Sequence, residues 1–341
     1  RWMPSFTRTE QVNLSVTPYY HCISRCVRRS FLCGTDAYSG KNYDHRKGWF
    51  VERLRLAAEG FCIDVCAFAI MSNHFHVVLR IDAERGAGLS DNAVLLRYGK
   101  FFPLAAKAVR ELPASVAADR IGVFRERLTD LGWFMRVINE HVSRRANKED
   151  ECTGRFWEGR FKSQALLDDA AVYTCMSYVD LNPVRAGLAD SLEGAEFTSI
   201  QQRLREAAGR KSGGRRRGGK KPAPGGKPVP KPVPLAPLRG EGRGGARTSL
   251  ELRFEDYVAQ LEWTGRALGR KSGGTLRGAP PAMLNAMKVD ADAWLRAMRG
   301  AGLARLTLFG APASIAAEAE RRGRRWLHGK GAARSMFRRA G

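Results

Sequence analysis

Two apolar segments in the first quarter of the chain stand only two residues apart. Residues 61–71 are almost all apolar, the turn residues Ser72 and Asn73 follow, and residues 74–81 begin with histidines around a Phe before becoming apolar. Short apolar runs bounded by glycine and turn residues are typical of buried strands, and two of them joined by a tight turn predict a β-hairpin. Because residues 61–71 are almost all apolar, we expect the first of these strands to be buried.

The segments on either side of this hairpin supply further elements. We expect a strand over residues 18–27, a helix over 45–59, helices within 88–118, a helix over 130–147, a loop entering a strand over 154–167, and a helix over 169–182. Asp168 is the expected N-cap of the last helix, and Pro183 is its expected end. The order strand, helix, strand, strand, helix, strand, helix is that of a split βαβ unit. We therefore predict an α+β fold with a ferredoxin-like split βαβ antiparallel sheet, followed by a C-terminal helical region.

The composition changes abruptly after the last of these helices. Residues 210–247 hold twelve Lys and Arg but a single acid, and Gly and Pro make up most of the remainder. This composition predicts a disordered, partly polyproline linker. We divide the chain into a first domain over residues 1–205, a basic Gly/Pro-rich linker over 206–248, and a helical basic accessory domain over 249–341, with DNA contact as its candidate role. In the accessory domain we expect three core aromatics, Trp263, Trp294 and Trp326.

The charge of the chain indicates the class of its partner. There are 58 Lys and Arg against 34 Asp and Glu, a formal net charge of +24, which favours nucleic acid or an anionic membrane. No apolar run reaches the roughly 18 residues of a membrane-spanning helix, and residues 1–6 lack the apolar core of a signal peptide. Seven cysteines, an odd number, suit buried free thiols in a reducing compartment. We therefore expect a cytoplasmic, nucleoid-associated protein that binds DNA and no membrane.

His74 and His76 lie two residues apart in the second strand of the hairpin. Side chains two apart on a strand point to the same side of the sheet, so both imidazoles can bind one metal ion. Two structural histidines are the competing interpretation, because a His-x-His pair alone is a weak signal. The pair begins an apolar strand, where polar side chains are costly unless they are used, and this favours a metal site.

Tyr178 and Asn182 lie four residues apart in the helix predicted over 169–182, so their side chains share one helical face. A tyrosine can attack a phosphodiester and hold the 5′ phosphate covalently. A divalent ion on the scissile phosphate would assist departure of the 3′ oxygen. An ordinary buried aromatic is the alternative for Tyr178, and a helix-end cap is the alternative for Asn182.

Three segments of the chain together resemble the single-tyrosine HUH transposases, nearest to the REP-associated tyrosine transposases. They are residues 71–79 (MSNHFHVVL), 154–163 (GRFWEGRFKS) and 178–187 (YVDLNPVRAG). The resemblance covers residues 15–205 and implies an HUH endonuclease fold for a catalytic domain over 1–205, with Mg²⁺ or Mn²⁺ as cofactor. It implies cleavage and rejoining of single-stranded or hairpin DNA through a 5′-phosphotyrosine intermediate.

The resemblance also implies roles for single residues. His74 and His76 become metal ligands, Tyr178 becomes the catalytic nucleophile, and Asn182 aligns with a glutamine ligand of the insertion-sequence relatives. Cations interleaved with aromatics in residues 154–163 suit phosphate contact and base stacking, whereas a loop packed by its own aromatics is the alternative. The expected DNA-binding residues are Asn73, Arg155, Trp157, Arg160, Lys162 and Arg185.

Three other functions fit the same residues. A relaxase or replication-initiator nuclease would use the same chemistry, and a domesticated protein would bind hairpin DNA without cleaving it. A zinc-dependent nucleic-acid binder would use two CxxxC pairs, Cys22/Cys26 and Cys62/Cys66, for which buried core thiols are the competing interpretation. A homodimer is compatible with each of these functions.

Overall fold

A five-stranded mixed sheet lies at the centre of the computed structural model, which describes residues 12–27, 33–35, 40–211, 231–241, 250–268, 279–300 and 302–337. The strands run in the order β2 (Ile63–Ile70), β3 (His74–Ile81), β1 (Tyr19–Arg25), β4 (Lys162–Leu166), β7 (Leu308–Phe309). The first four pair antiparallel in the order expected of a split βαβ unit. β7 pairs parallel with β4. The sheet is therefore mixed, which corrects the prediction of a sheet that is antiparallel throughout.

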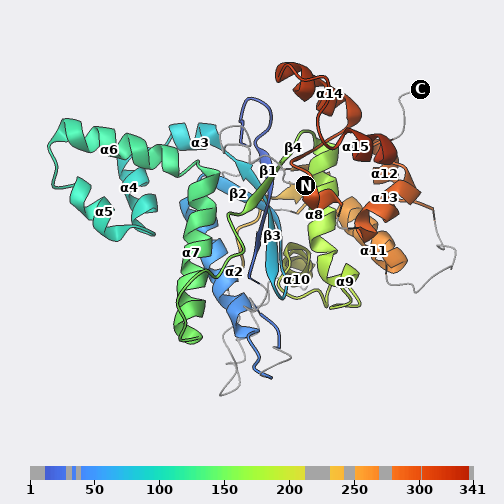
Figure 1. Ribbon diagram of the computed structural model, residues 1–341, viewed down its shortest axis with the longest axis horizontal. Helices are drawn as coiled ribbons and strands as arrows, with labels where there is room; N and C mark the ends of the chain where they lie inside the picture. Colours follow the sequence, from blue (N-terminus) through green and yellow to red (C-terminus); the bar gives the residue numbers. More distant parts are fainter. Residues whose placement is uncertain are drawn as a thin grey trace.

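Helices cover both faces of the sheet, which explains why every residue of β2 is buried. α2 (His45–Gly60) and α7 (Leu131–Glu149) lie on one face, and α8 (Asp169–Asp180) and α10 (Ser199–Lys211) lie on the other (Figure 1). A strand between two helical layers has no solvent-facing side, so its side chains are apolar on both faces. The predicted hairpin and the helices that flank it are confirmed to within a few residues.

The expected N-cap Asp168 is confirmed, Asp130 caps α7 in the same way, and the role of Pro183 is corrected. Asp130 accepts a hydrogen bond from the backbone N–H of Trp133 at the start of α7, and Asp168 does the same for α8. α8 ends at Asp180, two residues before the predicted end, and a short helix α9 (Asn182–Arg185) follows at once. Pro183 lies in the first turn of α9, where its missing N–H has no helical partner to lose.

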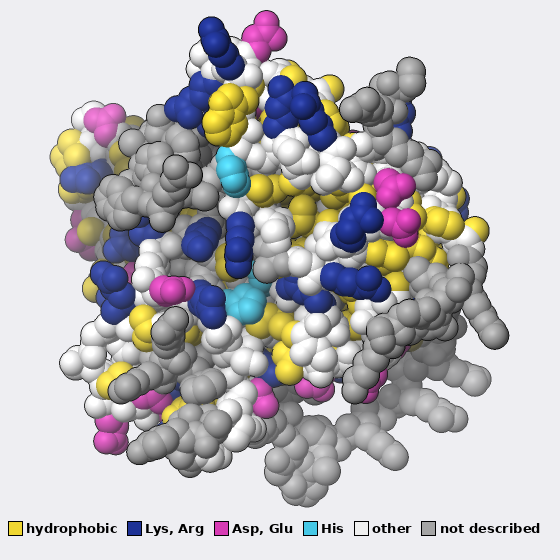
Figure 2. Space-filling model, turned by 45° about the vertical axis from the view of Figure 1, so that its right-hand side comes forward, with side chains coloured by type: hydrophobic (Ala, Val, Ile, Leu, Met, Phe, Trp, Pro, Cys, Tyr) yellow, Lys and Arg dark blue, Asp and Glu magenta, His cyan; other side chains and the backbone are white. Residues whose placement is uncertain are grey.

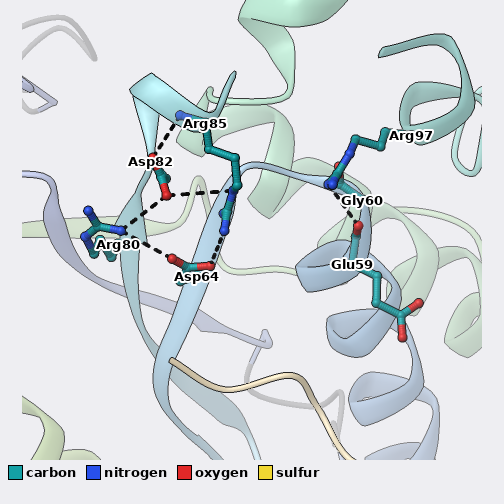
Figure 3. Close-up of polar contacts among 7 residues, drawn as sticks. All are labelled: Glu59, Gly60, Asp64, Arg80, Asp82, Arg85 and Arg97. Carbon is teal, nitrogen blue, oxygen red and sulfur yellow. Dashed lines mark hydrogen bonds and ion pairs between the residues drawn. The ribbon is translucent and has the colours of Figure 1, made fainter. Parts of the chain in front are cut away.

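A helical arm projects from the sheet on the side of α2 and α7 (Figure 1). It comprises α3 (Ala83–Ala87), α4 (Asp91–Gly99), α5 (Pro103–Val109) and α6 (Ala114–Arg127). Ion pairs anchor it where β3 ends: the buried carboxylate of Asp64 binds Arg80 at 3.4 Å and Arg85 at 2.9 Å, and Asp82 also contacts both arginines (Figure 3). Arg97 of α4 donates to the last two carbonyls of α2, so the arm is tied to the sheet and to the helix beside it (Figure 3).

The interval predicted as a linker is partly structured. α10 runs to Lys211, past the predicted boundary at residue 205, and residues 231–241 lie against β2, where the Ala236 N–H donates to the carbonyl of Val65 at 2.8 Å. Arg203 and Glu241 form a fully buried ion pair at 2.7 Å. Residues 212–230 and 242–249, which include most of the predicted linker, lie outside the described residues.

The C-terminal part of the chain packs on the α8 side of the sheet (Figure 1). Its elements are β5 (Leu238–Arg239), β6 (Leu250–Arg253), α11 (Phe254–Leu268), α12 (Ala282–Ala286), α13 (Ala291–Arg299), η1 (Leu303–Arg305), α14 (Pro312–Arg321) and α15 (Lys330–Met336). Tyr257 donates to Asp180 at the end of α8 at 2.7 Å, and both side chains are fully buried. Trp263 and Trp294 are core aromatics as predicted, whereas Trp326 is exposed. Among the described residues, no helix combines the length and apolarity needed to cross a bilayer.

Candidate active site

A cavity of about 700 Å³ opens beside β3 and the end of α8. His74 and His76 line it from β3, Tyr178 lines it from α8, and Asn182 lines it from α9. The side chains predicted to bind a metal and to attack a phosphate, which are about a hundred residues apart in the chain, therefore face a common space.

Strand geometry determines which side chains reach this cavity. Alternate residues of β3 point to opposite faces, so His74 and His76 share the face that α8 crosses while Phe75 is buried on the other side. The ring centroids of His76 and Tyr178 are 5.9 Å apart. β1 pairs antiparallel with β3 and places Arg25 directly opposite His74. Arg25 therefore also lines the cavity, although the sequence analysis did not identify it.

A chain of hydrogen bonds fixes the tautomer of His76. The side-chain amide of Gln164 donates from Nε2 to the carbonyl of Leu303 at 2.8 Å, so its oxygen faces Nδ1 of His21 at 3.2 Å. Nδ1 of His21 must carry the proton, and its Nε2 then accepts from Nδ1 of His76 at 2.9 Å. Nε2 of His76 is left as an unprotonated nitrogen, buried and without a hydrogen-bond partner among the described residues. Sequence reasoning missed His21 and Gln164.

His74 is oriented by its neighbour in the same way. Nδ1 of His74 lies 2.7 Å from the side-chain oxygen of Asn73, which can only accept, so Nε2 is again unprotonated. Burial, and then the charges of Arg25 and Arg185, lower the pKa of His74 to about 4. Burial also holds the pKa of His76 well below its ordinary value. Both imidazoles are therefore neutral near pH 7, which is the form that binds metals.

Tyr178 lies beneath an arginine. Its side chain is 3% exposed, and the guanidinium carbon of Arg185 sits 4.1 Å from the centre of its ring. Arg185 also donates to the side-chain oxygen of Asn182 at 2.6 Å and to the carbonyl of Gly300 at 3.2 Å. The amide nitrogen of Asn182 is buried and unpaired among the described residues. Arg185 therefore connects the tyrosine, the amide and the C-terminal part of the chain.

The remaining walls of the cavity are strongly basic. Five cations line it: Arg25, Arg160, Lys162, Arg185 and Arg305. Glu158 is the one acid among the described residues that line it. On the surface, Lys and Arg side chains gather around a histidine on one face of the molecule (Figure 2). This arrangement suits a ligand that carries several negative charges.

The other predicted DNA-binding residues lie elsewhere. Asn73 contacts His74 rather than the cavity, and Arg155 is exposed outside the lining. Trp157 packs edge-on against Phe75, with ring centroids 5.7 Å apart, and its Nε1 donates to the carbonyl of Asn139 at 2.9 Å. This indole is thus engaged with the protein interior, which fits the alternative in which the loop is packed by its own aromatics.

The CxxxC pairs form no metal site in the part of the chain that the structure describes. Cys22, Cys26, Cys62 and Cys66 are all buried in the core. Burial raises the pKa of Cys62, and it raises that of Cys26 beyond the normal range of a thiol. No group of three or more His, Cys, Asp or Glu side chains among the described residues is placed to hold a metal ion. The burial of all four cysteines agrees with the core-thiol interpretation.

Comparisons with known proteins return little. No protein-family model matches the chain, and no curated protein matches it. A solved structure of a REP-associated tyrosine transposase bound to a REP hairpin is similar at 12% sequence identity and a TM-score of 0.37, over 60% of this chain and 86% of that one. A likeness of this size carries no conclusion about the chemistry of the chain, so its function is inferred from its own residues.

Proposed function

We propose that the protein is a metal-dependent, transposase-type enzyme that cleaves and rejoins single-stranded or hairpin DNA through a 5′-phosphotyrosine. One observation carries the proposal: Tyr178 lies in the same cavity as two neutral histidines whose Nε2 atoms are unprotonated. The split βαβ order of the first four strands agrees with an HUH endonuclease fold. The cations around the cavity would bind the DNA backbone.

A divalent metal ion fits the donors of this cavity. His74 and His76 would each supply Nε2, and Asn182 would supply an amide oxygen that it shares with Arg185. Water or phosphate oxygens would complete the set of ligands. Imidazole ligands suit Mn²⁺ better than Mg²⁺, which prefers oxygen ligands, so we expect Mn²⁺ to bind more tightly. When bound, such an ion supplies Lewis acidity at the scissile phosphate.

The chain's own residues would perform the transfer around that phosphate. The bond between Tyr178 Oη and phosphorus forms as the bond from phosphorus to the 3′ oxygen breaks. The tyrosine proton passes to solvent, and the released 3′ oxygen takes up a proton. Because the phosphotyrosine is itself a diester, a later 3′ hydroxyl can reverse the exchange and rejoin the strand. Arg185, which lies over the tyrosine ring, would meet the phosphate charge.

The test is the formation of a covalent adduct. Labelled single-stranded and hairpin oligonucleotides are incubated with the full chain and Mn²⁺ or Mg²⁺, then resolved on a denaturing gel. We expect an adduct with wild-type protein and none with Tyr178→Phe. Tyr173→Phe is the matched control, because Tyr173 is a second buried tyrosine on the same helix and does not line the cavity. An adduct that survives Tyr178→Phe would exclude the proposed nucleophile.

Binding of hairpin DNA without cleavage is a second candidate function. It is favoured by the near-complete burial of Tyr178 under Arg185. It is also favoured because, within the described residues, no third His, Cys, Asp or Glu is placed to hold a metal ion with His74 and His76. On this alternative, the wild-type chain binds hairpin oligonucleotides with the same affinity in EDTA as in Mn²⁺ and forms no adduct. A metal-dependent adduct would exclude it.

A further inference from the structure

Trp326 is exposed, whereas the two other tryptophans of the C-terminal part of the chain are buried. Its side chain is 66% exposed, whereas Trp263 and Trp294 lie in the core. Arg324 and Arg325 precede it directly. Surfaces that bind single-stranded nucleic acid combine exposed aromatic side chains with cations. The aromatic ring stacks on a base, and the cations contact the phosphates.

A hollow of about 400 Å³ surrounds this tryptophan. Leu306 and Leu327 form its apolar floor with Trp326, and Lys330 and Arg334 line its side. No acidic side chain is among the described residues that line it, and neither of these two cations forms an ion pair within the described part of the chain. The hollow is therefore lined by apolar side chains together with two cations that have no acidic partner among the described residues.

The hollow and the active-site cavity meet at adjacent residues. Arg305 lines the cavity that holds Tyr178, and Leu306, the next residue, lines the hollow that holds Trp326. Both belong to the segment that runs from η1 into β7 at the edge of the sheet. A DNA strand bound at the cavity would have to cross this segment to reach the indole.

We propose that this hollow is a base-binding subsite for the same single strand of DNA, with a base stacked on Trp326 and the adjoining phosphates on Lys330 and Arg334. The inference rests on the proposed function, since it extends the strand held in the cavity. Every base has a stacking face and every nucleotide has a phosphate, so the subsite is tolerant of sequence. A duplex keeps its bases stacked on each other and cannot offer one to the indole.

The test measures how affinity grows with the length of the DNA. Fluorescence anisotropy is recorded on full-length protein in EDTA with labelled oligothymidylates of about 4 and about 16 nucleotides, the range that single-strand grooves occupy. Wild-type protein should bind the longer probe more tightly than the shorter one. In Trp326→Ala this ratio of affinities should be about tenfold smaller. Trp326→Phe, which keeps a stacking ring, should retain most of it. The plot of log affinity against log salt has a negative slope. Replacing both Lys330 and Arg334 with alanine should make that slope shallower by about 1.4.

Leu104→Ala is the matched control, because Leu104 is 83% exposed on α5 of the helical arm and lines neither space. This variant should keep the full gain. If Trp326→Ala behaves like Leu104→Ala, the subsite is wrong while adduct formation by Tyr178 still supports the proposed function. An equal loss with a blunt duplex would overturn stacking in favour of backbone contact alone. If the wild-type chain binds neither single-stranded probe, the subsite is wrong, and adduct formation by Tyr178 in the presence of metal decides the proposed function separately.

Discussion

The tautomer of His76 is determined by hydrogen-bonding groups that lie outside the His-x-His pair. His21 is directly opposite Gln164 on β4 and diagonal to His76 on β3, so all three side chains share one face of the sheet. The last acceptor is the carbonyl of Leu303, which the C-terminal part of the chain brings to the site. A metal-binding histidine usually depends on such a partner for its orientation and basicity.

Replacing His21 should therefore weaken metal binding even though His21 is no ligand. His21→Phe fills the space but offers no acceptor to Nδ1 of His76, so that the proton can move to Nε2. We expect Mn²⁺ affinity, measured by calorimetry on the apo protein, to fall by about 10-fold to 100-fold. His21→Gln can place an oxygen near the lost Nε2 and should recover most of the affinity. Mn²⁺ binding by His21→Phe at the wild-type affinity would exclude this role.

The histidine pair and the tyrosine could be predicted from sequence, whereas His21 and Gln164 could not. His74 and His76 can be recognised from the local sequence, because they are polar side chains at the start of an otherwise apolar strand. The relation of His21 to Gln164 depends on β1 lying between β3 and β4, and no pattern within residues 18–27 reveals a strand's neighbours. The same limit applies to Arg305, whose place in the cavity depends on the packing of residues 302–309.

Among the elements, the start of α8 is joined to the start of α14, just after β7, by a carboxylate with two functions. One oxygen of Asp168 caps α8 by accepting from Ala171 at 2.9 Å, and the other accepts from the backbone N–H of Ala311 at 2.7 Å. Gly310 allows this approach, because an added Cβ would lie 2.9 Å from the second oxygen. The cap could be predicted from the sequence, but the contact with Ala311 could not, since a two-residue strand such as β7 has no periodicity.

Loss of Asp168 should consequently cost more than loss of an ordinary cap. Asp168→Ala removes the cap of α8 and also leaves the N–H of Ala311 without its partner. Asp130→Ala removes only the cap of α7, where the accepted hydrogen bond is exposed. We expect the free energy of unfolding to fall by about 2–3 kcal/mol for Asp168→Ala and by about 1 kcal/mol for Asp130→Ala. Urea unfolding followed by circular dichroism measures both, and equal losses would show that the bond to Ala311 adds nothing.

Over the whole molecule, the first domain and the C-terminal part share one core. The buried pair of Arg203 and Glu241 ties α10 to residues 231–241, and Tyr257 ties α11 to Asp180. Composition predicted a disordered linker between them because Gly, Pro, Arg and Lys dominate residues 206–248. Within that interval, four apolar side chains between Val233 and Leu238 are nevertheless buried. Composition averages over such a short anchored segment and hides it.

Cutting the chain within residues 212–230 should therefore leave the two parts associated. A specific protease site is inserted there, and the cleaved protein is passed over a size-exclusion column. We expect both fragments to elute together at the volume of the uncleaved protein and to separate only in urea, because β7 completes the sheet and Leu303 holds Gln164. The same protein before cleavage is the control. If the C-terminal fragment elutes alone under native conditions, residues 249–341 form a separate accessory domain, and the shared core does not hold the molecule together.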